Sequence, residues 1–66
     1  MKTLTAAQVG ASKGGFDGWH VQFEADGKQV KGTLYAASSP NGATYADLTV
    51  DGVNYSLTKL TPVTVF

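Results

Sequence analysis

Two Asp-Gly pairs, at residues 26–27 and 51–52, each separate two stretches in which apolar and polar residues alternate. Alternation with a period of two is typical of a β-strand that has one buried face. Asp-Gly between such stretches favours a two-residue type I′ turn, because both central residues of that turn need positive φ. The sequence therefore predicts two β-hairpins, and each turn fixes which residues pair across its strands.

Pairing outward from the first turn separates apolar from polar side chains. One face holds Trp19, Val21, Phe23, Val30 and Leu34, and the other face is polar. A slip of one residue would mix the two sets, so the burial pattern supports the register that the turn imposes. The predicted pairs are Ala25 with Lys28, Glu24 with Gln29, Phe23 with Val30, Gln22 with Lys31, Val21 with Gly32, His20 with Thr33 and Trp19 with Leu34.

The second hairpin sorts in the same way around its own turn. Its apolar pairs, Val50 with Val53 and Leu48 with Tyr55, fall on one side, and its polar residues fall on the other. An isolated hairpin is marginally stable in water, so we expect the two hairpins to pack together. The remaining predicted pairs are Ala46 with Leu57, Thr49 with Asn54, Asp47 with Ser56 and Tyr45 with Thr58.

The segments outside the hairpins are less regular. Residues 37–43 and 10–15 are predicted to be loops, the latter flexible, and residues 63–66 a short final strand after Pro62. At the N-terminus, residues 5–8 fit a capping box with Gly10 as a stop, which indicates one helical turn. The alternative is a strand or extended arm over residues 2–8, with Leu4 and Ala6 inward. We favour the strand slightly, because so short a helix is marginal alone.

These elements predict an all-β fold: one small domain over residues 1–66, a small antiparallel barrel or curled sheet of five to six short strands. In outline, its long first loop and short hairpins resemble an SH3-like barrel, a comparison of architecture that does not fix function. The chain has no cysteine, which excludes disulfides, and one histidine, which leaves no imidazole pair for a structural zinc ion.

The charge balance argues against polyanionic partners. Five lysines offset five acidic residues, and the chain has no arginine. Binding to nucleic acid or to anionic membranes depends on an excess of cationic side chains, so we expect neither. No stretch approaches the roughly 18 apolar residues of a membrane span. The first residues lack the apolar run of a signal peptide, so we expect a cytoplasmic protein.

No group of residues in the sequence indicates catalysis. His20 falls on the polar face of its hairpin, with neither a carboxylate to orient it nor a nucleophile beside it. Asp26 and Asp51 are explained by their turns, and the acidic residues do not match a calcium-loop pattern. We therefore expect a protein that is not an enzyme and that uses no metal or cofactor.

The aromatic residues suggest where a partner binds. Tyr35 and Tyr45 fall on the polar faces of their hairpins and flank the loop between them. Exposed tyrosines are favoured interface anchors, although both could simply be exposed surface residues. The other aromatics are predicted to lie in the core (Trp19, Phe23, Tyr55) or to seal its ends (Phe16, Phe66). The candidate protein-binding residues are Tyr35, Ser38, Ser39, Pro40, Asn41 and Tyr45.

These observations favour a non-enzymatic β module that acts by protein–protein contact with a partner the sequence does not identify. An inhibitor or adaptor, such as those carried by phages or mobile elements, fits this size. One alternative is a self-associating subunit of a larger assembly, since small sheets have unpaired edges. Another is a small barrel that binds an oligonucleotide or saccharide by stacking on Tyr35, Tyr45 or Trp19.

Overall fold

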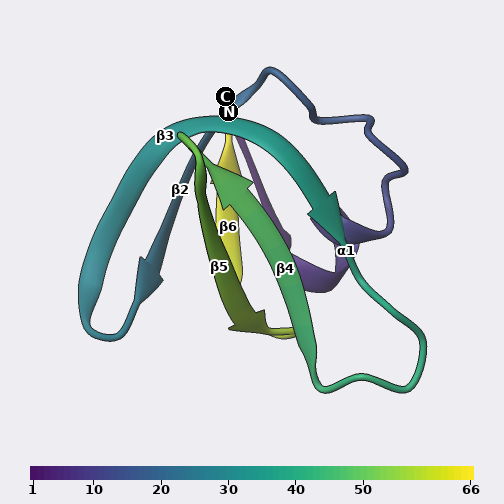
Figure 1. Ribbon diagram of the computed structural model, residues 1–66. Helices are drawn as coiled ribbons and strands as arrows, with labels where there is room; N and C mark the ends of the chain where they lie inside the picture. The colour runs from purple at the N-terminus through teal and green to yellow at the C-terminus, as the bar shows by residue number, and fades with distance from the viewer.

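Six antiparallel strands and one short helix make up the structure, a computed structural model that describes residues 1–66 (Figure 1). The strands form one curled sheet in the order β1-β6-β2-β3-β4-β5, and the sheet does not close into a barrel. Of the two predicted architectures, the curled sheet is therefore the one observed. The elements are β1 (Lys2–Thr5), α1 (Ala6–Gly10), β2 (His20–Ala25), β3 (Lys28–Ser38), β4 (Tyr45–Val50), β5 (Val53–Thr58) and β6 (Pro62–Val65).

Both predicted hairpins are confirmed in position and register. β2 pairs with β3 from His20 opposite Thr33 to Ala25 opposite Lys28. In the same way, β4 pairs with β5 from Tyr45 to Val50 in the predicted order. Asp26 and Asp51 have φ of 52° and 50°, and the glycines that follow them have φ of 79° and 82°. These are the positive angles that a type I′ turn requires.

The curvature of the sheet comes from β3, which arches across the molecule in Figure 1. Its first half pairs with β2 and its second half with β4. The register shifts between Leu34 and Ala36, so Tyr35 is an extra residue in a β-bulge opposite Thr49. In a regular strand, Leu34 and Ala37 would point to opposite faces, because they are three residues apart. The bulge between them turns both side chains toward the core.

The core lies inside the curled sheet, and α1 covers one end of it. Ala6 and Val9 of α1 are fully buried. Gly10 fits closely against β3, because a Cβ there would lie 2.7 Å from the carbonyl group of Ser38. The eleven buried residues are Ala6, Val9, Val21, Phe23, Leu34, Ala46, Leu48, Val50, Leu57, Val63 and Val65.

The N-terminal segment combines the two alternatives left open by the sequence. Residues 2–5 form β1 beside β6, and Thr5 then starts α1 with the predicted capping box to Gln8. The preference for a strand is therefore wrong from Ala6 onward. Tertiary contacts stabilise this single turn. The Ala6 N–H donates to the backbone carbonyl of Thr61 at 2.8 Å, and the Ala7 N–H donates to the backbone carbonyl of Lys59 at 3.1 Å.

The structure also shows where Trp19, Phe16 and Phe66 lie relative to the core. Trp19 is 44% exposed, so its assignment to the core is wrong. It precedes β2 and meets Phe16 edge to face at 5.2 Å, and Phe16 in turn packs on the core. Phe66 stacks on the exposed His20, with the Lys31 ammonium 5.5 Å from its ring centre, and so lies on the polar side of β2.

Candidate functional site

The two tyrosines of the predicted site are exposed, as expected, and they line different hollows. Tyr35 is 77% exposed and Tyr45 is 53% exposed. Tyr45 begins β4, whereas Tyr35 lies beside Thr49 near the other end of that strand. The separation along β4 is roughly 13 Å at about 3.3 Å per residue. Each tyrosine lines a separate hollow, and the two hollows have no residue in common.

The loop residues of the predicted site lie at the Tyr45 end of β4. Ser38 ends β3 opposite Asp47, and Ser39 packs close to Gly10 of α1. The carbonyl oxygen of Pro40 accepts a hydrogen bond of 2.8 Å from the Lys59 ammonium, and Asn41 is exposed. The structure therefore places this loop at the Tyr45 end of β4, and it follows Tyr35 along β3 by way of Ser38.

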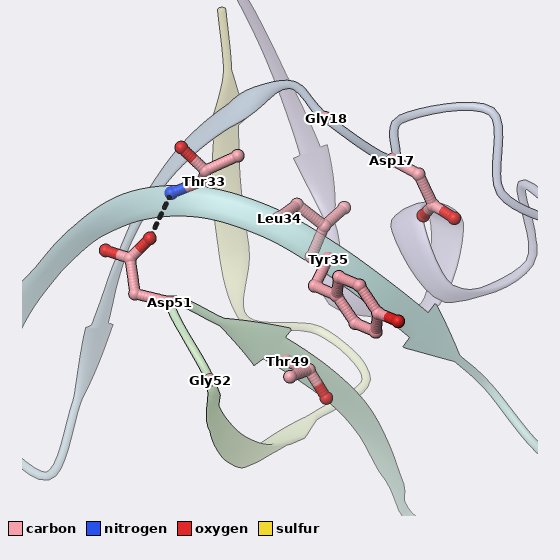
Figure 2. Close-up of a pocket in the computed structure, with 8 residues that line it drawn as sticks. All are labelled: Asp17, Gly18, Thr33, Leu34, Tyr35, Thr49, Asp51 and Gly52. Atoms are coloured by element: carbon pink, nitrogen blue, oxygen red, sulfur yellow. Dashed lines mark hydrogen bonds between the residues drawn. The ribbon is translucent and has the colours of Figure 1, made fainter.

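Tyr35 stands at a hollow of about 730 Å³, referred to below as the Tyr35 hollow. In Figure 2 the ring of Tyr35 lies between Leu34 above it and Thr49 below it on β4, two other residues that line the hollow. The volume falls within the range of about 300–1,000 Å³ that is usual for ligand sites. The lining residues are Asp17, Gly18, Thr33, Leu34, Tyr35, Thr49, Asp51 and Gly52.

Two hydrogen bonds at Leu34 hold the backbone just before Tyr35. The Leu34 N–H donates to the Trp19 carbonyl, and the Leu34 carbonyl accepts from the Gly18 N–H, both at 2.8 Å. These bonds extend the pairing of β3 beyond the start of β2. Leu34 itself is buried, so the residue before Tyr35 is fixed both by packing and by its backbone.

The turn of the second hairpin forms the opposite wall of the Tyr35 hollow. The Asp51 carboxylate accepts a hydrogen bond of 3.1 Å from the Thr33 N–H (Figure 2). The Asp51 N–H in turn donates to the Thr33 carbonyl at 3.2 Å. Gly32 makes this close approach possible, because a Cβ there would collide with the Asp51 carboxylate and with Val50. A glycine inside a strand is the sequence signal for such an approach.

The charged groups of the Tyr35 hollow are two carboxylates, Asp17 and Asp51. In Figure 2 they stand on opposite sides of Tyr35, and Asp51 is turned toward the Thr33 N–H. Nowhere in the chain do three His, Asp or Glu side chains cluster in a way that could hold a metal ion. The hollow therefore presents an aromatic ring, hydroxyl groups and carboxylates to a partner.

A second depression, referred to below as the β5-edge cleft, has a volume of about 510 Å³. It is lined by residues 24–26 at the end of β2, by Tyr45 and by residues 54–58 of β5. The charged groups among them are Glu24 and Asp26. Each of the two depressions is thus bordered by one of the two Asp-Gly turns.

Comparison with known proteins identifies no relative of this chain. No protein-family model, no curated protein and no solved structure matches it. None of its helical structure is long and apolar enough to reach across a membrane. A functional proposal therefore depends on the geometry of the two depressions.

Proposed function

We propose that this chain is a non-enzymatic binding module that acts by contact with another protein, with Tyr35 as its anchor and the Tyr35 hollow as its contact site. The observation that carries the proposal is a tyrosine 77% exposed at the rim of a hollow of about 730 Å³. Tyrosine is enriched among interface residues that dominate binding energy, because it offers a large contact area with few rotatable bonds.

The backbone around Tyr35 supports this role. Leu34 is fixed by two hydrogen bonds, and Thr33 is held by the carboxylate of Asp51. A partner that binds Tyr35 therefore has little backbone to order, and pre-organisation of this kind reduces the entropic cost of association. An inhibitor or adaptor of a cytoplasmic protein is the form of this function that we favour.

Charge favours a protein partner over a nucleic acid. Both depressions carry carboxylates as their charged groups: Asp17 and Asp51 in one, Glu24 and Asp26 in the other. A single-stranded nucleic acid stacks on aromatic rings within a positively charged groove, and carboxylates would repel its phosphates. A protein surface with hydroxyl, amide or cationic groups is the better match.

Paired tyrosine variants test the proposal. Wild type, Tyr35→Ala and Tyr45→Ala are immobilised at equal density, and the proteins that they retain from a lysate of the source cells are quantified by mass spectrometry. The expected partner is retained by wild type and by Tyr45→Ala, and its affinity falls at least about tenfold with Tyr35→Ala. The thermal midpoint of Tyr35→Ala should stay close to that of wild type, because the side chain is exposed. Equal retention by Tyr35→Ala and wild type would contradict the proposal.

A further inference from the structure

β5 is an edge strand with a row of free backbone groups. It pairs with β4 alone. Next to a two-residue turn, Val50 and Val53 exchange hydrogen bonds, and bonded pairs recur at every second residue. At the far end of the hairpin, the Lys59 N–H donates to the Thr44 carbonyl at 3.2 Å, which is a bonded pair at the position that this alternation predicts. The N–H and C=O groups of Asn54 and Ser56 therefore point away from β4, toward the open edge.

The β5-edge cleft follows this row of groups. Successive side chains of β5 alternate between two faces, with Leu57 buried and Asn54 and Ser56 exposed. All five residues from 54 to 58 nevertheless line the cleft. A depression that contacts both sets of side chains must run along the edge of the strand rather than over one of its faces.

β5 also lacks the features that usually protect an edge strand. Natural sheets block exposed edges with lysine, proline or a bulge. β1, the other edge strand, carries Lys2, and β6 beside it begins with Pro62. β5 reads Val-Asn-Tyr-Ser-Leu-Thr, without a charge or a proline, and its pairing with β4 is regular throughout. Of the two edges, β5 is thus the one open to strand addition.

The charge on the other wall indicates what kind of strand would bind. Glu24 and Asp26 border the cleft and are exposed, and neither carboxylate accepts a hydrogen bond from the protein, whereas Asp51 does. A bound segment that carries lysine or arginine would pair with both groups. In a second copy of this chain joined β5 to β5, the pairing strand itself would offer these carboxylates no cation, because β5 has no cationic residue.

We propose that the β5-edge cleft binds an extended, positively charged segment of a partner protein, which adds to the sheet as a strand beside β5. Backbone groups of Asn54 and Ser56 would pair with the segment, as in other cases of strand addition. Glu24 and Asp26 would select its cationic side chains, and Tyr45 would cover one end. This surface is separate from the Tyr35 hollow, so the inference goes beyond the proposed function and can fail independently of it.

A designed peptide tests the proposal on the full chain. The probe is a blocked peptide of alternating lysine and valine, about seven residues long, the length of an ordinary strand. It is titrated into ¹⁵N-labelled protein at low salt. Amide shifts are expected at Asn54, Ser56, Glu24 and Asp26, and not at Thr33 or Gly18 beside the Tyr35 hollow. The double variant Glu24→Gln/Asp26→Asn, which keeps the turn, should bind roughly three- to tenfold more weakly.

Two control peptides separate strand addition from charge alone. Methylation of every second backbone nitrogen, on the side facing β5, removes the hydrogen bonds and should abolish binding. Replacement of lysine by glutamate should also abolish it. Equal binding of either control peptide, or shifts centred on Thr33, would overturn the proposal. Shifts at Asn54 and Ser56 that depend on protein concentration without peptide would assign the edge to a second copy instead. The variant Tyr35→Ala should bind the peptide as wild type does.

Discussion

The two Asp-Gly turns have the same backbone conformation and different surroundings. Asp51 packs against β3, where its carboxylate binds the Thr33 N–H across a close approach allowed by Gly32. Both aspartates are exposed, but the Asp26 carboxylate, at the tip of the first hairpin, accepts no hydrogen bond from the protein. The same dipeptide therefore has a structural role in one hairpin and leaves a free charge in the other. A turn signal specifies the backbone, whereas the use of the side chain depends on the rest of the fold.

The largest effect is expected where the second turn meets β3. Gly32→Ala introduces a Cβ that would lie 2.8 Å from a methyl carbon of Val50 and would collide with the Asp51 carboxylate. We expect a loss of about 2–3 kcal/mol in the free energy of unfolding, measured by chemical denaturation.

Gly27→Ala in the other hairpin is the matched control, because no atom lies within 4 Å of the added Cβ and the cost comes from its φ of 79°. That cost should be about 1–2 kcal/mol. If Gly32→Ala were as mild as Gly27→Ala or milder, the close docking of the second turn would be contradicted.

An intermediate effect should distinguish the two aspartates directly. Asp51→Gly and Asp26→Gly both preserve a turn with positive φ, since glycine adopts that conformation freely. Asp51→Gly loses the exposed hydrogen bond to Thr33 and should lower the free energy of unfolding by about 0.5–1.5 kcal/mol. Asp26→Gly should change it by no more than about 0.5 kcal/mol. Equal losses in the two variants would show that the Asp51 carboxylate contributes nothing to stability.

The smallest effect on stability is expected on the open edge of β5. Asn54→Lys places a cation on an exposed position whose side chain makes no hydrogen bond, so the free energy of unfolding should change by less than about 0.5 kcal/mol. The same variant should repel the cationic peptide, whereas the neutral control Asn54→Gln should bind it as wild type does. Unchanged affinity for the peptide in Asn54→Lys would show that the segment binds elsewhere.

Much of the fold follows from local sequence signals. The Asp-Gly turns and the alternation around them predict both hairpin registers, and Pro62 marks the start of the last strand. The bulge at Tyr35 has no such signal, because it depends on how β3 must bend to pair with β2 and β4 at once. The exposure of Trp19 likewise depends on where the pairing with β3 ends.

The candidate site was harder to predict for the same reason. The positions of Tyr35 and Tyr45 on polar faces follow from alternation, and both side chains are exposed. Their distance from each other depends on the length of β4 that lies between them, so the two tyrosines of the predicted patch line different hollows. Sequence alternation assigns a residue to a face of the sheet, but it does not show which residues of that face lie together.

Amide hydrogen exchange on the monomeric protein tests the central claim most directly, namely that the second hairpin is docked at its turn and open along its outer edge. The account predicts slow exchange at Thr33, Tyr55 and Leu57, and exchange close to that of an unstructured chain at Asn54 and Ser56. In Asp51→Gly, exchange at Thr33 should become faster while Tyr55 and Leu57 stay protected. Fast exchange at Thr33 in the wild type, or protection of Asn54 and Ser56 equal to that of Tyr55 and Leu57, would contradict it.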